Sequence, residues 1–267
     1  MQKIGIIAGN RKFPLILAEA ARGKGYYTVA VAVRKDTSRR IHDYADKVYW
    51  VGLNDYSRLF DIFKSEGIAN VVMAGQISPH RLFGKEIKLD LRLKKILREI
   101  SDKKADSIFG AIARELKSEG LELMDSTLFL QEYLPKKGAL TRQVPNFDQW
   151  EDVYFGFELA KEMGLLDIGQ TVAVKEKAVV AVEALEGTDN LIRRAGKIAR
   201  NGVTVVKVSK PGQDKRFDIP VVGLNTVKNL VRIRAACLAI EAEKTLFIDR
   251  QESVKLADRY GLAIVAI

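Results

Sequence analysis

The sequence predicts an α/β protein with a Rossmann-like N-terminal domain, built on a parallel sheet, and a distinct α/β C-terminal domain. Short β-rich runs alternate with helical patterns, and glycine marks many of the turns between them. A charged segment rich in helix breakers, Leu134–Gly138, interrupts the pattern near the middle of the chain. Because 267 residues suffice for two ordinary domains, we expect one domain over 1–134 and a second over 135–267.

The N-terminal domain begins with a β-rich run that ends at Gly9 and leads into a helical pattern. Strands and helices then alternate with short connections, as in a doubly wound parallel sheet. The predicted strands are Lys3–Ala8, Tyr27–Val33, Lys47–Val51, Ala69–Met73 and Glu122–Met124, and the predicted helices are Phe13–Arg22, Tyr56–Glu66 and Ser107–Ser118.

A basic amphipathic helix is predicted over Lys85–Lys104. Its apolar residues recur at helical spacing and form one stripe, Leu89, Leu93, Ile96, Leu97 and Ile100. A stripe of this kind usually packs on the core of its own domain. The alternative is that the helix faces a partner subunit or lipid head groups.

The C-terminal domain is predicted to mix strands and helices, and it contains no internal repeat. The predicted strands are Thr171–Val174, Ala178–Ala184, Thr204–Val208, Thr245–Ile248 and Ala263–Ala266. The predicted helices are Asp148–Met163, Asn190–Arg200, Thr226–Glu243 and Glu252–Tyr260, and a turn is expected at Pro220–Gly223.

The composition excludes several classes of active site. A single cysteine, Cys237, excludes a disulfide framework and thiolate clusters for zinc or iron–sulfur. Two histidines, His42 and His80, leave little for a histidine-ligated metal or a serine–histidine hydrolase. Any chemistry must therefore use carboxylates, basic side chains, backbone amides and a hard metal cation.

No apolar run approaches the ~18–20 residues that span a bilayer, and the N-terminus lacks a signal-peptide layout, so we expect a cytoplasmic protein. The formal charge of +10 lies mainly in residues 1–140, which carry 25 Lys and Arg against 17 Asp and Glu. These basic residues are mixed with acids and are not interleaved with aromatics, so we expect no nucleic acid partner. They suit phosphates or an anionic membrane surface.

Turns at the carboxyl edge of the predicted N-terminal sheet form the first candidate site. Gly9 and Asn10 follow the first strand, and Gly75 and Gln76 follow the fourth. Free amides at such an edge attract anions, so we expect these residues to contact a phosphate or another polar ligand. The alternative is a tight turn without a ligand. The three-glycine dinucleotide fingerprint is missing, which argues against an NAD-type site.

The second candidate segment contains Glu186, Thr188 and Asp189, ahead of the helix predicted from Asn190. It combines two carboxylates and a hydroxyl next to Gly187. The alternative interpretation is structural, with Thr188 or Asp189 capping the first amides of that helix.

The densest cluster of charge is the loop Lys207–Pro220. Lys210, Gln213 and Arg216 can hold phosphate oxygens, and carboxylates such as Asp218 can face a metal ion. Charged loops are usually only solvated. Proline near both ends stiffens this one, however, and a stiff charged loop suits a preorganised site.

These segments resemble the family of UDP-2,3-diacylglucosamine pyrophosphatases of lipid A biosynthesis in Gram-negative bacteria. The resemblance is carried by Leu166–Gln170, Glu186–Asp189 and Lys210–Pro220. It extends over essentially the whole chain, including Gly5–Pro14 and Ala139–Pro145. The chain departs from the family's usual residues at Asn10, commonly a glycine, and at Gln76, often a lysine.

The resemblance implies hydrolysis of the sugar-nucleotide pyrophosphate to 2,3-diacylglucosamine 1-phosphate (lipid X) and UMP, with Mg²⁺ or, alternatively, Mn²⁺. It implies Asp218 as the catalytic residue, a catalytic C-terminal domain and a homodimer. We expect Asp218, Glu186 and Asp189 to hold the metal. We expect substrate contacts from Gly9, Asn10, Gly75, Gln76, Thr188, Lys210, Gln213 and Arg216. A diacylated substrate also suits peripheral association with the inner membrane.

Two other classes stay open. A non-catalytic nucleotide-sugar or lipid-binding protein would explain the positive charge but not the loop of carboxylates and cations. A Rossmann-type nucleotide-sugar oxidoreductase would need the glycine fingerprint that the turn after Gly9 lacks.

Overall fold

The computed structural model describes residues 1–76, 90–100 and 105–267 of the chain. Its contacts divide the protein into two compact units. Unit 1 contains Met1–Gln131 together with Asp214–Asp218, and unit 2 contains Glu132–Gln213 and Ile219–Ile267. The short segment Asp214–Asp218 therefore packs with the N-terminal unit although it lies far along the chain.

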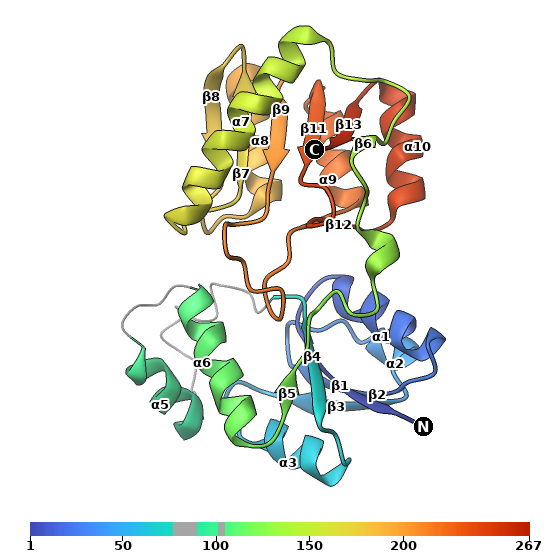
Figure 1. Ribbon diagram of the computed structural model, residues 1–267, viewed down its shortest axis with the longest axis vertical. Coiled ribbons are helices and arrows are strands. Elements are labelled where there is room, and N and C mark those ends of the chain that lie inside the picture. The colour runs from blue at the N-terminus through green and yellow to red at the C-terminus, as the bar shows by residue number, and fades with distance from the viewer. Residues whose placement is uncertain (77–89, 101–104) are drawn as a thin grey trace. The chain divides into compact units, whose positions relative to one another are not determined.

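Unit 1 is built on a five-stranded sheet, sheet A, in which every neighbouring pair of strands is parallel (Figure 1). Its order is β3-β2-β1-β4-β5, with β1 Lys3–Ala8, β2 Tyr27–Val33, β3 Lys47–Val51, β4 Asn70–Ala74 and β5 Glu122–Leu123. The helices are α1 Phe13–Gly23, α2 Ile41–Tyr44, α3 Arg58–Ser65, α5 Leu91–Glu99 and α6 Ala105–Ser118. The predicted Rossmann-like parallel sheet is confirmed.

The core of unit 1 fills the space between sheet A and its helices. Phe60 and Phe63 of α3 and Leu116 of α6 are almost fully buried with the inward-facing valines of β2. α3 can supply this packing because its apolar residues recur at helical spacing and its remaining residues are mostly charged or polar. Burying these rings provides much of the hydrophobic stabilisation of the unit.

Sheet A has its topological switch point between β1 and β4. From β1 the chain runs outward through β2 to β3, and it then returns to place β4 on the other side of β1. In open parallel sheets, ligands bind at the carboxyl ends of the strands at such a point. The turns after β1 and β4 therefore occupy the position that the fold favours for binding.

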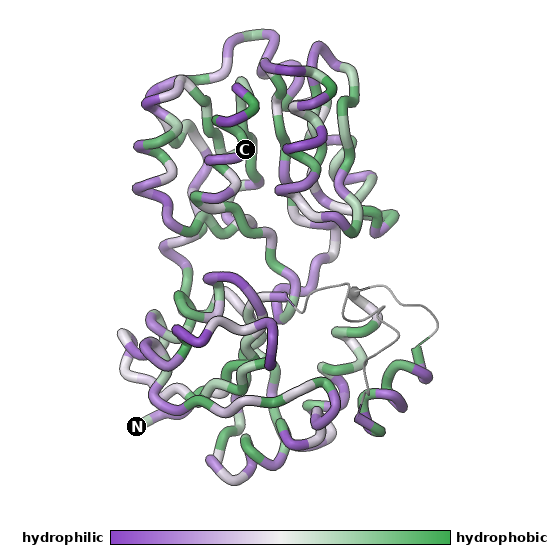
Figure 2. Tube along the Cα trace, turned by 180° about the vertical axis from the view of Figure 1, so that it is seen from behind, coloured by the Kyte–Doolittle hydropathy of each residue, from purple (hydrophilic) through white to green (hydrophobic). Residues whose placement is uncertain are grey.

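The helix predicted over Lys85–Lys104 is shorter in the described residues. α5 begins after Asp90, whose side chain accepts a hydrogen bond from the Arg92 amide, and it ends before Ile100, which is extended. Leu93 and Ile96 are buried in unit 1, so the packing interpretation of the stripe is confirmed for these residues. Figure 2 shows hydrophobic and hydrophilic residues alternating along this helix. Positions 85–89 and 101–104 lie outside the described residues.

Unit 2 contains a six-stranded mixed sheet, sheet B, with the order β6-β13-β11-β9-β7-β8 (Figure 1). Its strands are β6 Gly138–Ala139, β7 Thr171–Lys175, β8 Ala178–Val182, β9 Thr204–Lys207, β11 Cys237–Ile240 and β13 Ala263–Ala266, and a separate pair joins β10 Val221–Val222 to β12 Leu246–Phe247. The helices are α7 Phe147–Leu165, α8 Thr188–Ala199, α9 Leu224–Arg232 and α10 Arg250–Tyr260, and a 3-10 turn covers Gln131–Tyr133. The mixed α/β character predicted for this part is confirmed.

Sheet B is covered on both faces, which explains why its central strand β11 is apolar throughout. Alternate residues of β11 enter different cores: Cys237 packs on the face that α7 covers, and Leu238 packs on the opposite face with α8, α9 and α10. α7 approaches the sheet closely at Gly156, where a Cβ would lie 2.7 Å from Val206 Cγ2.

Two predictions for unit 2 are wrong. The single helix expected over Thr226–Glu243 ends at Arg232, and β11 follows it as a central strand of sheet B. The run Cys237–Ile240 is apolar without a clear period, so its pattern alone cannot separate a buried strand from a helix. The turn expected at Pro220–Gly223 contains the short strand β10, which pairs in parallel with β12.

Among the described residues, no helix combines the length and apolar character needed to cross a membrane.

Candidate active site

The turns after β1 and β4 cross each other in direct backbone contact. The Gly9 amide donates to Ala74 O and the Asn10 amide donates to Gln76 O, both at 2.8 Å. A Cβ on Gly9 would lie 2.7 Å from Gln76 O, and a Cβ on Gly75 would lie 2.4 Å from Asn10 O. The crossing therefore needs glycine at both positions. The sequence-based expectation that these four residues lie together at one sheet edge is confirmed.

One part of the sequence argument needs correction at this crossing. Free amides were expected in the first turn, but those of Gly9 and Asn10 are used in backbone hydrogen bonds. The Gln76 amide also lies 3.4 Å from Asn10 Oδ1. The role of these four residues in ligand binding stays a prediction, and it has to rest on groups other than the amides of Gly9 and Asn10.

The segment Asp214–Asp218 is anchored at the same edge of sheet A. Ser126, which follows β5 and is 1% exposed, contacts the backbone of this segment. Its amide donates to Lys215 O at 2.9 Å, and its hydroxyl lies 2.8 Å from both Arg216 O and Met73 O. The Phe217 ring stacks on Phe109 of α6 with ring centroids 5.5 Å apart. Together these contacts hold the loop against unit 1.

Within this loop, Arg216 and Asp214 form a bidentate ion pair. Arg216 Nε lies 2.9 Å from Asp214 Oδ1, and Nη2 lies 2.6 Å from Oδ2. The Arg216 guanidinium lowers the pKa of Asp214, and Asp214 raises the pKa of Arg216. The Asp218 amide donates to Asp214 O at 3.1 Å, so the same turn fixes the backbone of Asp218.

Lys210 and Gln213 belong to unit 2 and are held by other partners. Lys210 forms an ion pair with Asp167, and its amide donates to Gln213 Oε1 at 2.8 Å. The Ser209 hydroxyl donates to the same oxygen at 2.6 Å, and Gln213 Nε2 lies 3.4 Å from Gln170 Oε1. These contacts form a local network in the part of the loop Lys207–Pro220 that belongs to unit 2. Contacts of these residues with phosphate stay predictions.

Thr188 lies in a buried polar cluster that the sequence analysis missed. Lys207 Nζ donates to Thr188 Oγ1 at 2.7 Å, and Thr188 Oγ1 donates to Glu183 Oε1 at 2.8 Å. Glu183 and Lys207 are 7% and 5% exposed. Glu183 and Lys207 lie next to the last residues of the predicted strands Ala178–Ala184 and Thr204–Val208 and face the same hydroxyl. A polar residue near the end of each of these apolar runs was the available signal.

The capping interpretation of the second segment is wrong. Gly187 is the N-cap residue of α8, with a φ of 80°, and no side chain caps the first amides of the helix. Thr188 instead faces Lys207 and Glu183. Asp189 accepts hydrogen bonds from Asn225 at 2.8 Å and from Asn229 at 3.1 Å.

The three carboxylates expected to hold a metal have separate surroundings. Glu186 is exposed and pairs with Arg194, Asp189 is bound by two asparagines, and Asp218 lies in unit 1. In the part of the chain that the structure describes, no three His, Cys, Asp or Glu side chains gather into a metal-holding group. A Mg²⁺ ion usually takes only one or two protein carboxylates together with phosphate and water oxygens. One carboxylate is therefore enough for such an ion, and the metal-holding role of Asp218, Glu186 and Asp189 stays a prediction.

These features define the class of the protein. It is a two-unit α/β protein whose Rossmann-like sheet carries, at its carboxyl edge, a glycine crossing and a loop with an arginine and two aspartates. This edge is the favoured position for an anionic ligand in such folds.

Comparison with known proteins identifies the family. Residues 3–133 match the LpxI N-terminal domain and residues 136–265 match the LpxI C-terminal domain. A relative from Caulobacter vibrioides, UDP-2,3-diacylglucosamine pyrophosphatase LpxI, is 30% identical over 100% of this chain and 98% of its own length. The chain belongs to the LpxI family. The resemblance drawn from the sequence motifs is thus confirmed, and membership of this family gives no support to the oxidoreductase alternative.

Likenesses to solved structures are weak. The biotin carboxylase domain of a thermophilic 2-oxoglutarate carboxylase shares 15% identity, with a TM-score of 0.28 over 65% of this chain and 35% of that chain. N5-carboxyaminoimidazole ribonucleotide synthetase from Thermotoga maritima shares 19% identity, with a TM-score of 0.26 over 71% of this chain and 43% of that one. The chain thus spans less than half the length of these proteins, and scores this low do not show a shared fold.

Proposed function

We propose that the protein hydrolyses the pyrophosphate bond of UDP-2,3-diacylglucosamine to UMP and 2,3-diacylglucosamine 1-phosphate, in lipid A biosynthesis. The observation that carries this proposal is the full-length relationship to a pyrophosphatase of that name. The charged loop at the carboxyl edge of sheet A supports it, because a pyrophosphate needs cations to neutralise it and a group to orient the attacking water.

Three residues of the loop Asp214–Asp218 have roles in the proposed hydrolysis. Asp218, which the family resemblance marks as catalytic, accepts a hydrogen bond from the attacking water and orients it. The water oxygen bonds to one phosphorus, the bridging P–O bond breaks, and the released proton passes to solvent through the carboxylate. Arg216 holds a phosphate oxygen, with Asp214 keeping its guanidinium in position through the bidentate pair.

The proposal includes Mg²⁺, with Mn²⁺ as a substitute. A divalent ion would neutralise the developing charge on the phosphate oxygens and help align the water. Asp218 would be its protein ligand, and phosphate oxygens and waters would complete the coordination. Any contribution from Glu186 or Asp189 would require them to exchange Arg194 or the two asparagines for the ion.

Lys210 and Thr188 of unit 2 stay predicted substrate contacts. Both already contact charged partners, Lys210 through Asp167 and Thr188 through Lys207 and Glu183. The Lys210 ammonium has three donors, so it would bind a phosphate oxygen while it keeps its ion pair with Asp167. The homodimer, the cytoplasmic location and the association with the inner membrane surface stay predictions.

The experiment is direct hydrolysis by the purified chain. UDP-2,3-diacylglucosamine in detergent micelles is incubated with Mg²⁺, with Mn²⁺ and with excess EDTA, and UMP and the sugar phosphate are quantified. We expect both products in equal amounts with either ion and none with EDTA. A run in ¹⁸O-labelled water shows which phosphorus the water attacks. Absence of both products under every metal condition would contradict the activity, and full turnover in EDTA would contradict the metal requirement alone.

A further inference from the structure

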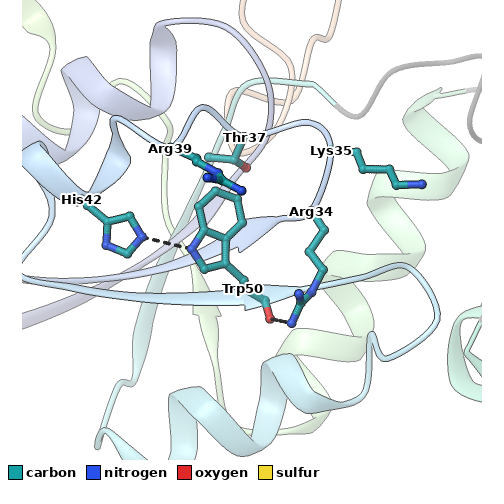
Figure 3. A pocket seen from close by; sticks show the side chains of 6 residues that line it. All are labelled: Arg34, Lys35, Thr37, Arg39, His42 and Trp50. Atoms are coloured by element: carbon teal, nitrogen blue, oxygen red, sulfur yellow. Dashed lines mark hydrogen bonds between the residues drawn. The ribbon is translucent and has the colours of Figure 1, made fainter.

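A basic pocket with an aromatic wall lies in unit 1, among side chains that the proposed reaction has not used. Its volume is about 790 Å³, within the range of small-molecule sites. The residues that line it are Arg34, Lys35, Thr37, Arg39, His42 and Trp50 (Figure 3). Three of them are cations, and no carboxylate is among these lining residues.

The fold places this pocket at the same carboxyl edge of sheet A. Arg34 and Lys35 directly follow β2, and Trp50 lies near the end of β3. Thr37 connects the pocket to the switch point, because its hydroxyl donates to Ala8 O at the end of β1. The Val33 amide donates to the same hydroxyl at 2.9 Å. The pocket thus belongs to the edge that also carries the glycine crossing.

Trp50 is held as a wall of the pocket by two neighbours. Its indole Nε1 donates to His42 Nε2 at 3.0 Å, and its carbonyl accepts from Arg34 Nη2 at 3.2 Å. Figure 3 shows Arg34 and Arg39 extending toward Trp50, whereas Lys35 points away from it. Lys35 and Arg39 are exposed and form no ion pair with any described residue. The indole of Trp50 is therefore fixed, and the charges of Lys35 and Arg39 are not used in ion pairs with described residues.

We propose that this pocket binds a nucleoside monophosphate, with the base stacked on Trp50 and the phosphate held by Arg34 and Arg39. Arginine side chains bind phosphate oxygens in a bidentate manner, and a base gains binding energy by stacking on an indole. An acyl chain is disfavoured, because it would leave both arginines facing apolar groups. This inference rests on the proposed function for the identity of the nucleotide, which is the uridine nucleotide of the substrate.

The test uses the fluorescence of Trp50 in the full-length protein. The chain contains two tryptophans, so Trp150→Phe leaves Trp50 as the single reporter. We expect UMP to quench or shift the Trp50 emission in a saturable way, and uridine to bind at least ten-fold more weakly. Inorganic phosphate should compete with UMP without producing the stacking signal. Glucosamine 1-phosphate, the head group of the other product, should produce no such signal.

Two arginine substitutions test where the phosphate of UMP binds. Arg39→Gln should raise the Kd for UMP about ten-fold or more, because it removes a charged contact. Arg259→Gln, at an exposed arginine of α10 in unit 2, is the matched control and should leave the Kd unchanged. Both arginines are exposed, so both variants should fold, and circular dichroism checks this.

The results separate the pocket from the proposed function. A saturable UMP signal that Arg39→Gln weakens supports the pocket even if the chain does not hydrolyse the sugar nucleotide. If the chain hydrolyses the substrate but Trp50 does not respond to UMP, and Arg39→Gln leaves the KM unchanged, the pocket is not the nucleotide site. A response to glucosamine 1-phosphate in place of UMP would also overturn the assignment.

Discussion

Replacing Ser126 with alanine should destabilise unit 1 and loosen the loop Asp214–Asp218. The side chain is buried, and its hydroxyl lies 2.8 Å from two carbonyl oxygens, Met73 O in β4 and Arg216 O in the loop. β5 covers only Glu122–Leu123, so Met73 O lies beyond the end of that strand and Ser126 extends the pairing. Ser126→Ala leaves buried acceptors without this donor.

The expected loss of unfolding free energy is about 1–3 kcal/mol, the cost of leaving a buried polar group unsatisfied. For a chain of this size this corresponds to a fall in Tm of about 2–12 °C. Urea unfolding followed by Trp50 fluorescence, in the Trp150→Phe background, reports on unit 1.

Ser118→Ala is the matched control. Ser118 also has its hydroxyl 2.8 Å from a carbonyl oxygen, that of Glu115, but it lies on the exposed end of α6. Because water replaces the lost contact there, the change in unfolding free energy should stay below about 0.5 kcal/mol. Equal effects of the two substitutions would refute the claim that Ser126 anchors the loop through buried hydrogen bonds.

Three further predictions concern other parts of the chain. Gly9→Ala should destabilise unit 1 by about 1–3 kcal/mol, because its Cβ would meet the Gln76 backbone, whereas Gly23→Ala meets no atom within 4 Å and should be neutral or stabilising in the same urea assay. Burial raises the pKa of Cys237 to about 12, so its thiol should resist a thiol reagent at about pH 8 until the protein unfolds; rapid stoichiometric labelling would contradict this. Burial alone would raise the pKa of Glu241, but hydrogen bonds from Lys161, Lys244 and the Ser209 amide lower this pKa overall. The ionised carboxylate therefore stabilises the fold, and this contribution is lost when the pH falls. As the pH falls from about 6 to about 3, the wild type should lose more unfolding free energy than Glu241→Gln.

The first three strands were predictable because each apolar run of the sequence forms one buried strand of sheet A. β1, β2 and β3 occupy the residues that their apolar runs predict, since glycine or charged residues bound each run. The run Cys237–Ile240 failed because helical residues precede it without a proline or glycine, and only its place between β9 and β13 makes it a strand.

Some contacts of the candidate site were predictable from the sequence, and others were not. The bidentate pair of Asp214 and Arg216 joins residues two apart, so a close reading of the loop could have predicted it. The contacts of Ser126 and Phe109 with the loop span about 90 to 110 positions of sequence, and no periodic pattern encodes such pairs. The crossing of Gly9 and Gly75 was predictable only as a shared sheet edge; its backbone contacts, which use two of the expected free amides, depend on the packed geometry.

The central claim is that Asp218 carries the hydrolysis, and Asp218→Ala compared with Asp214→Ala tests it most directly. Each substitution removes one carboxylate from the same five-residue loop. Asp218→Ala should lower kcat by on the order of 10²–10³ with little change in KM, because it removes a group that acts mainly in the transition state. Asp214→Ala should instead raise KM more than it lowers kcat, since it releases the guanidinium of Arg216. Near-wild-type kcat for Asp218→Ala together with an inactive Asp214→Ala would contradict the account.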